Sequence, residues 1–297
     1  MTTVRPEGLS AYIAVTAAYW AVMLTGSKNM VKGVGFLLGA ALLETVDFVG
    51  AVLGMAAVLA VILIAVPAFM PGGLPKGRKD AKFSDIFSKS PNVDWLSAAR
   101  VVLLGARDVW FVVGIPIYFY AVLSDGTTQG NRTAFFLIGT FMAVWVILYG
   151  LVQANAPRIL RAKSCPTAEQ ILAARGWAWA LGAVPAVLAV AALVANDPQD
   201  WLTLSVVAGL LVFGALFAVN SSFHSFLILS FTKAERVTMD VGFYYMANAA
   251  GRLIGTLASG LSYQVGGLPL MLGIAAGMVA LSAVAVSFLT PEEEQPA

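Results

Sequence analysis

Long apolar runs separated by short polar turns make up most of the chain. A helix needs about 20 apolar residues to cross the hydrocarbon core of a bilayer, and eight runs reach that length. Because the runs are continuously apolar rather than alternating, they predict an all-α polytopic membrane protein. We predict spans at residues 19–43, 48–70, 96–123, 133–154, 176–194, 202–230, 241–263 and 268–289. Residues 1–17 are apolar but interrupted, and they form a poorly defined N-terminal segment.

A polar loop at residues 71–93, rich in Gly, Pro and Lys, reads as a linker between two groups of helices. Two spans lie before it, within residues 18–70, and six follow within residues 94–290. Residues 291–297 form a short acidic tail. The division predicts two groups of transmembrane helices of unequal size.

The distribution of basic residues predicts the orientation of the spans. Lys and Arg gather in the loops at 71–93, 157–175 and 233–236. Basic loops stay in the cytoplasm. The intervening turns contain neither residue type, and they are 44–47, 124–131, 195–201 and 264–267. Every loop therefore agrees with one topology, in which both termini are cytoplasmic.

Composition narrows the function classes. The chain is 59% hydrophobic and 11% charged, whereas soluble domains carry about 25% charged residues. A net charge of +2 gives no indication of nucleic-acid binding. The sequence contains no phosphate-binding Walker loop and no Ser/His/Asp set, and one histidine with one cysteine argues against a metal site. We therefore expect no enzyme activity and no cofactor. Coupling of transport to protons is compatible with this expectation.

Charged residues inside the predicted spans are the strongest functional candidates. Arg252 lies near the centre of its span, where an arginine costs about 2.5–3.5 kcal/mol on insertion scales. Arg107 and Asp108 lie about 15 Å into theirs at 1.5 Å per residue, and Lys32 is also deep. The deep cations outnumber the one deep acid, so the simplest missing counter-charge is an anionic ligand. The arginine fork suits phosphate or carboxylate.

Other polar residues share helix faces with these charges. Lys28 lies four residues before Lys32, and Asn248 lies four before Arg252. We predict substrate contacts from Arg107, Arg252, Lys32, Lys28, Asn248 and Arg100, and proton coupling at Asp108 and His224. Asp108 is the preferred coupling group because its protonation depends on whether Arg107 pairs with it or with substrate. A structural alternative stays open, in which Lys28 reaches the membrane interface and Arg107 pairs locally with Asp108.

Glycine pairs four residues apart suit helices that approach closely. The pairs are Gly35 and Gly39, Gly50 and Gly54, Gly251 and Gly255, and Gly273 and Gly277. They fit a bundle whose helices move against one another.

A basic central loop followed by six spans resembles the second half of a major facilitator superfamily transporter. Such transporters bind substrate at the midplane between two six-helix halves. GVGFLLGAALL at 33–43 is similar to the antiporter motif in the fifth helix of that superfamily's exporters, without the motif's proline. Longer segments resemble ArsJ-type organoarsenical efflux permeases, and they lie at 24–42, 82–90, 96–116 and 233–264.

The resemblance implies export of 1-arseno-3-phosphoglycerate across the bacterial inner membrane. A glyceraldehyde-3-phosphate dehydrogenase makes this compound when it uses arsenate in place of phosphate, so the resemblance implies a functional pairing that gives arsenate resistance. A small polyanion also agrees with the excess of deep cations. Since complete members have two six-helix halves, the eight spans expected here correspond to the last two of the N-terminal half and all six of the C-terminal half.

Two alternatives remain at this stage. One is a transporter of another phosphorylated solute or of a drug-like molecule. The other is a truncated chain that is inactive alone, because part of the N-terminal wall of the central cavity is missing.

Overall fold

The computed structural model describes the backbone of residues 6–46, 48–69, 90–159, 166–195, 198–232 and 236–291, and the side chains of these residues except 6–19, 21 and 159. Every element in these ranges is a helix. Most of the predicted loop at 71–93, together with Cys165 and the acidic tail, lies outside the described residues. The elements are α1 (Pro6–Thr45), α2 (Phe48–Phe69), α3 (Pro91–Asp108), the π-helix η2 (Val109–Gly114), α4 (Ile115–Leu123), α5 (Thr128–Ile159), α6 (Thr167–Ala195), α7 (Asp200–Ser230) and α8 (Val237–Val286).

Within the described residues, six helices are long and apolar enough to cross a membrane. They are α2, the continuous helix formed by α3, η2 and α4, and α5, α6, α7 and α8. This content indicates a membrane-embedded protein. The span expected at 19–43 lies within α1, which is not among these six.

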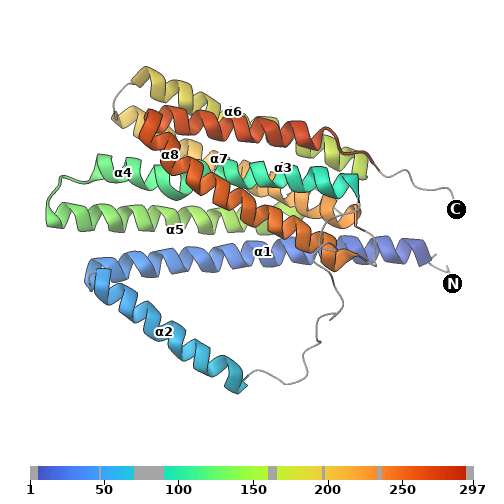
Figure 1. Cartoon of the computed structure of the whole chain (residues 1–297), viewed down its shortest axis with the longest axis horizontal. Helices are drawn as coiled ribbons and strands as arrows, with labels where there is room; N and C mark the ends of the chain where they lie inside the picture. Colours follow the sequence, from blue (N-terminus) through green and yellow to red (C-terminus); the bar gives the residue numbers. More distant parts are fainter. Residues whose placement is uncertain are drawn as a thin grey trace.

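Helix α8 breaks at two consecutive glycines. Gly266 has φ −141° and ψ 17°, and Gly267 has φ 63° and ψ −156°. A positive φ strains residues that carry a Cβ, so Gly267 suits this corner. The break divides α8 into two arms, at 237–265 and 268–286, which coincide with the two spans predicted there. Figure 1 shows the second arm turning back toward the C-terminus.

The helices lie side by side along the long axis of the molecule (Figure 1). We call the end where α1 begins and α8 ends the terminal end. The opposite end, where α4 turns into α5 and α8 breaks, is the turn end (Figure 1). Helix α1 runs along α5, whereas α2 leans away from the bundle. Among the described residues of α2, only Ala51 is buried, so this helix presents apolar side chains to lipid or to another surface.

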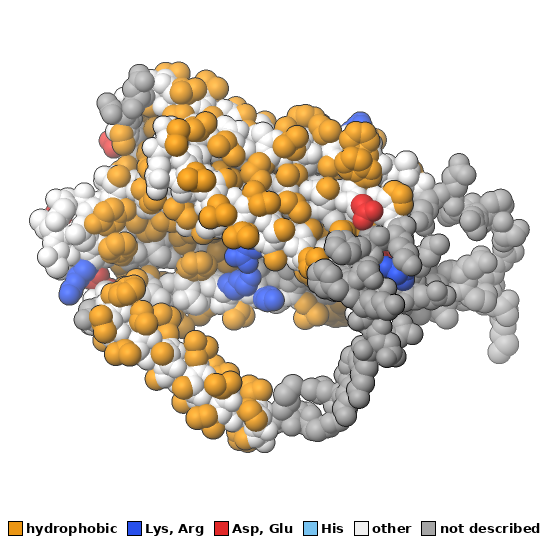
Figure 2. All heavy atoms as spheres, in the orientation of Figure 1, with side chains coloured by type: hydrophobic (Ala, Val, Ile, Leu, Met, Phe, Trp, Pro, Cys, Tyr) orange, Lys and Arg blue, Asp and Glu red, His pale blue; other side chains and the backbone are white. Residues whose placement is uncertain are grey.

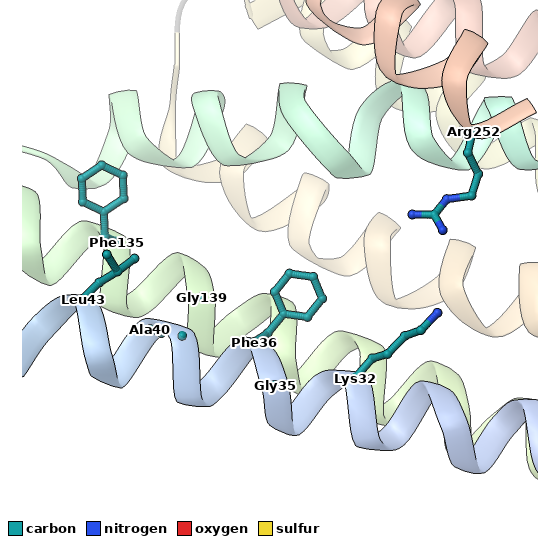
Figure 3. A pocket seen from close by; sticks show the side chains of 9 residues that line it. Lys32, Gly35, Phe36, Ala40, Leu43, Phe135, Gly139 and Arg252 are labelled. Carbon is teal, nitrogen blue, oxygen red and sulfur yellow. The ribbon is translucent and has the colours of Figure 1, made fainter. Parts of the chain in front are cut away.

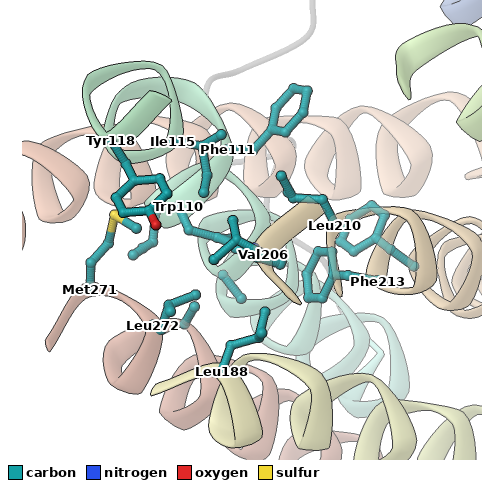
Figure 4. Packing of buried hydrophobic residues seen from close by; sticks show 14 of the residues in the cluster. Trp110, Phe111, Ile115, Tyr118, Leu188, Val206, Leu210, Phe213, Met271 and Leu272 are labelled. Carbon is teal, nitrogen blue, oxygen red and sulfur yellow. The ribbon is translucent and has the colours of Figure 1, made fainter. Parts of the chain in front are cut away.

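A cluster of buried aromatic side chains fills the bundle around η2 (Figure 4). The Trp110 ring meets the Phe213 ring edge-on, with centroids 4.8 Å apart. The Phe111 and Trp145 ring centroids lie 4.0 Å apart. The Trp145 indole N–H donates to the Leu210 carbonyl at 2.7 Å, so this indole is buried without losing its hydrogen bond.

The π-helix begins directly after Asp108, and the sequence pattern does not predict it. Single turns of π-helix are rare and frequently lie at functional sites, because the extra residue changes the direction of the following side chains. The buried Gly114 N–H donates to Ser259 Oγ of α8 at 3.1 Å. Helix α8 therefore supplies a hydrogen-bond acceptor to the end of η2.

Helices α3 and α8 touch backbone to backbone. A Cβ added to Gly251 would lie 2.2 Å from the Val101 carbonyl oxygen, and one added to Gly255 would lie 2.4 Å from the Gly105 oxygen. The predicted close approach is confirmed at this pair. It is wrong for Gly35, Gly39, Gly54, Gly273 and Gly277, where an added Cβ would meet no atom within 4 Å.

A second glycine-mediated contact joins α1 to α5, and we call it the α1–α5 seam. A Cβ on Gly26 would lie 2.7 Å from the Gly150 carbonyl oxygen, and a Cβ on Gly150 would lie 2.7 Å from the Gly26 carbonyl oxygen. One turn farther along α1, Asn29 Nδ2 donates to Gln153 Oε1 at 2.7 Å. The seam holds the helix that carries Lys32 against the six-helix group that follows the linker.

Candidate functional site

The Asp108 carboxylate lies between two arginines at the end of α3. Its side chain is 1% exposed. Oδ1 accepts from Arg107 Nη2 at 2.6 Å and from Arg107 Nε at 2.7 Å. Oδ2 accepts from Arg252 Nε at 3.1 Å. The one acid that the sequence places at this depth is thus shared by two of the predicted substrate-binding cations.

The two arginines differ in how they are held. The Arg107 side chain is 19% exposed, and its guanidinium lies over the Phe217 ring at 5.4 Å from the centroid. Such a cation–π contact adds to the ion pair and fixes the group. The Arg252 side chain is 57% exposed and contacts Asp108 through Nε. Arg252 therefore has the greater freedom to bind a ligand.

Arg252 faces Lys32 across an open cavity. The cavity has a volume of about 690 Å³, and α1, α5 and α8 line it. Figure 3 shows the two side chains pointing toward each other, Arg252 from α8 and Lys32 from α1. Figure 2 shows Lys and Arg side chains gathered at the middle of an otherwise apolar face. The cationic part of this face lies about halfway along the molecule (Figure 2).

Positive charge dominates this region. Lys32 is close enough to Arg252, Arg107 and Asp108 to interact electrostatically with each. Three cations and one carboxylate leave an excess of two positive charges. Among the described residues that line the cavity, none is acidic. An anion in the cavity would offset this excess of positive charge.

The rest of the cavity wall is apolar. Beyond Lys32, the cavity extends toward the turn end, past Phe36 and Leu43 of α1 and Phe135 of α5 (Figure 3). Gly35 and Gly39, which the sequence analysis assigned to helix packing, instead line this open space. Their lack of side chains widens the cavity. The cavity is thus cationic at Lys32 and Arg252 and apolar along the part that extends toward the turn end.

Lys28 lies outside the cavity lining. It is exposed on α1, one turn toward the terminal end from Lys32, and its charge acts on that residue. Its predicted direct contact with substrate therefore stays a prediction, and in this structure Lys28 contributes only long-range potential.

Arg100 and Asn248 form a separate group with Ser221 and Tyr244, which we call the Arg100 cluster. Arg100 is 8% exposed. Its Nε donates to Asn248 Oδ1 at 2.7 Å, and its Nη1 donates to Ser221 Oγ at 2.8 Å. The guanidinium lies 5.3 Å from the Tyr244 ring centroid. None of these residues lines the cavity, so the structure divides the predicted site into two parts.

His224, the other predicted coupling residue, is fully buried on α7. Neither ring nitrogen has a hydrogen-bond partner within the described part of the chain. It follows Ser221 by three residues and therefore lies on the same helix face, near Arg100 rather than at the cavity. Sequence analysis missed Ser221, Tyr244, Phe36 and Phe135. For the first two, helical spacing from His224 and Asn248 was the available signal.

Comparisons with protein-family models, with curated proteins and with solved structures gave no match to this chain.

Proposed function

We propose that the chain is a membrane carrier for a small organic anion. The proposal rests on one observation above others, that Lys32 and Arg252 face each other across a cavity midway along apolar helices (Figure 3). An ionisable residue at membrane depth is a functional candidate by default, because burying it costs free energy that packing alone does not offset. Transporters also place their substrate sites near the bilayer midplane.

In this mechanism Asp108 neutralises part of the positive charge of the site before an anion binds. Asp108 occupies one face of Arg252 and holds Arg107 in place. An incoming phosphate, arsenate or carboxylate competes with Asp108 for the Arg252 guanidinium, and Lys32 contacts it from the opposite wall. The proposal assigns proton coupling to Asp108, because its carboxylate contacts the same arginine that the anion would bind.

The leading substrate is 1-arseno-3-phosphoglycerate. Its identity, the direction of export, the bacterial inner membrane, the cytoplasmic termini and the pairing with a glyceraldehyde-3-phosphate dehydrogenase come from the resemblance of segments such as 24–42 and 233–264 to ArsJ-type permeases. The excess of cations at the site supports a polyanionic substrate. A cavity of about 690 Å³ falls within the usual 300–1,000 Å³ of small-molecule sites.

One feature favours a second candidate function. Phe36, Leu43 and Phe135 give the cavity an apolar wall beside its cations. A three-carbon polyanion has no apolar part for this wall, whereas an amphipathic anion has one. Transport of a larger, drug-like anion is therefore the alternative, and an experiment must distinguish it from transport of the three-carbon polyanion.

The test uses arsenate-sensitive bacterial cells that express the dehydrogenase with wild-type chain or with Arg252→Ala, Arg107→Ala or Arg132→Gln. Arg132 is exposed near the start of α5 and serves as the charge-loss control. We expect resistance from the wild type and the control, and loss of resistance in the other two at equal membrane levels. Retained resistance in Arg252→Ala would remove this residue from the site.

Uptake into everted vesicles then separates the substrates. Three labelled compounds are compared, namely 3-phosphoglycerate, its arseno-ester and an aryl phosphate. Selective uptake of the arseno-ester supports the leading substrate, and preference for the aryl phosphate supports the amphipathic anion. Absence of uptake of all three by the wild-type chain would support a chain that is inactive alone.

A further inference from the structure

The Arg100 cluster holds a buried cation for which the described residues supply no carboxylate. The ion pairs within them join Arg107 to Asp108, Arg236 to Asp240 and Arg252 to Asp108. Buried charges are normally paired, because the desolvation penalty of an isolated ion amounts to several kcal/mol even after relaxation. The partners of Arg100 are instead an amide, a hydroxyl and an aromatic ring. Its positive charge therefore remains uncompensated.

The donors of Arg100 also exceed its acceptors. A guanidinium presents five N–H groups, and the two hydrogen bonds to Asn248 and Ser221 use two of them. Both acceptors are neutral oxygens on different helices, α8 and α7. They leave Nη2 without a hydrogen bond among the described residues, and an oxyanion could take this donor.

His224 provides an independent observation that points to a ligand. Its side chain is completely buried, and within the described residues both ring nitrogens lack a hydrogen-bond partner. The charge of Arg100 acts on it. Asn220 Oδ1, four residues earlier on the same face of α7, is buried and unpartnered as well. Buried polar atoms of this kind are normally satisfied by protein, water or a bound group.

We propose that Arg100, Ser221, Asn248 and His224 form a second binding site for one oxyanion group of phosphate, arsenate or carboxylate type. Arg100 lies seven residues before Arg107, about 10 Å toward the terminal end at 1.5 Å per residue. The cavity at Lys32 and Arg252 extends toward the turn end instead. The second site is therefore separate from the cavity. It lies on the terminal side of the contact between Asp108 and Arg252.

This inference rests on the proposed function, since it adds a second site to the same anion route. It explains why α3 carries two arginines two helical turns apart on nearly the same face. Asn248 and Ser221 hold Arg100 in position while this site is empty.

Equilibrium dialysis of labelled inorganic phosphate against the detergent-purified full chain tests the proposal. We expect two classes of site in the wild-type chain. Arg100→Gln should remove one class and leave the other, Arg252→Ala should remove the second, and Arg132→Gln should retain both. An unchanged isotherm in Arg100→Gln, or a wild-type isotherm with only one class that Arg252→Ala removes, would overturn the second site.

The outcomes also separate this inference from the proposed function. If Arg252→Ala leaves the isotherm unchanged while Arg100→Gln removes a class, the cavity site fails and the second site stands. Should Arg100→Gln not accumulate, Ser221→Ala and His224→Gln replace it. Each is expected to weaken the same class about threefold or more and to leave the class that depends on Arg252 intact. No weakening in either variant contradicts the proposal.

Discussion

Asp108 Oδ2 lies 3.1 Å from Arg252 Nε, although 144 residues separate the two in the chain. The contact depends on the glycine that precedes Arg252. At Gly251 the α8 backbone comes so close to α3 that an added Cβ would lie 2.2 Å from the Val101 carbonyl oxygen. The helix contact and the charge contact are therefore parts of one arrangement, and a change in either one alters the other.

Gly251→Ala should separate α3 from α8. The new methyl group meets backbone rather than a flexible side chain, and overpacking of this kind costs about 1–3 kcal/mol, occasionally more. We expect a lower midpoint of thermal unfolding in detergent and a loss of anion binding at Arg252. Gly273→Ala, on the second arm of α8 with no atom within 4 Å of the added Cβ, is the matched control. Equal stability of the two variants would contradict the close contact.

Asp108→Asn should uncouple anion binding from protons. The amide cannot ionise, so Arg107 and Arg252 lose their shared counter-charge and an anion no longer competes with a carboxylate. We expect affinity for the anion to rise about tenfold, which corresponds to 1.4 kcal/mol. Exchange of anion across vesicles should persist, whereas accumulation driven by a pH gradient should disappear.

Asp125→Asn is the control for the Asp108 variant, because this acid lies in an exposed turn between α4 and α5. It should retain the wild-type response to a pH gradient. If Asp108→Asn also retains gradient-driven accumulation, proton coupling through Asp108 is wrong.

Gly35→Leu should block the cavity without unfolding the protein. Gly35 lines the cavity, and an added Cβ meets nothing within 4 Å, so the larger side chain enters open space. We expect uptake to fall at least tenfold, with the unfolding midpoint unchanged. Gly54→Leu, on α2 with the same open surroundings but outside the cavity lining, should leave uptake intact. Normal uptake by Gly35→Leu would show that substrate does not pass this wall.

Ser259→Ala should destabilise the π-helix. The variant removes a side-chain acceptor of the buried Gly114 N–H, and one hydrogen bond contributes about 0.5–1.5 kcal/mol to stability. Thermal unfolding measures the loss. Ser262→Ala is the control, because the Ser262 hydroxyl donates back to the Ser259 carbonyl within α8 and its loss leaves no orphaned backbone group. A shift of equal size in both variants would contradict the role of Ser259.

Hydropathy predicted the all-helical class because each span satisfies its own backbone hydrogen bonds and needs only length and apolar side chains. The break at Gly266 and Gly267 lies in the turn predicted at 264–267, although its geometry was not predicted. The π-helix after Asp108 was not predicted. Its last residue, Gly114, bonds to Ser259 and lies against Met271, both on α8, and no local pattern encodes such contacts.

Depth along a helix can be estimated from sequence, and the three residues chosen in this way, Arg107, Asp108 and Arg252, are in contact in the structure. The sequence is less informative about which neighbouring helix a given face of a helix contacts. Arg100 shares a face with Arg107 but bonds to Ser221 and Asn248 instead of lining the cavity. The glycine spacing of Gly35 and Gly39 equals that of Gly251 and Gly255, yet only the latter pair packs against a neighbour. Spacing gives a face, and tertiary packing decides what that face meets.

The α1–α5 seam has a mechanical consequence. At Gly26 and Gly150 the two backbones lie close together, with the Met30 and Ala154 side chains packed beside them, and Asn29 bonds to Gln153 one turn farther along α1. These contacts hold α1 at one rotation relative to α5. Lys32 is therefore fixed to α5, and the width of the cavity would change only if α1 and α5 moved together relative to α8.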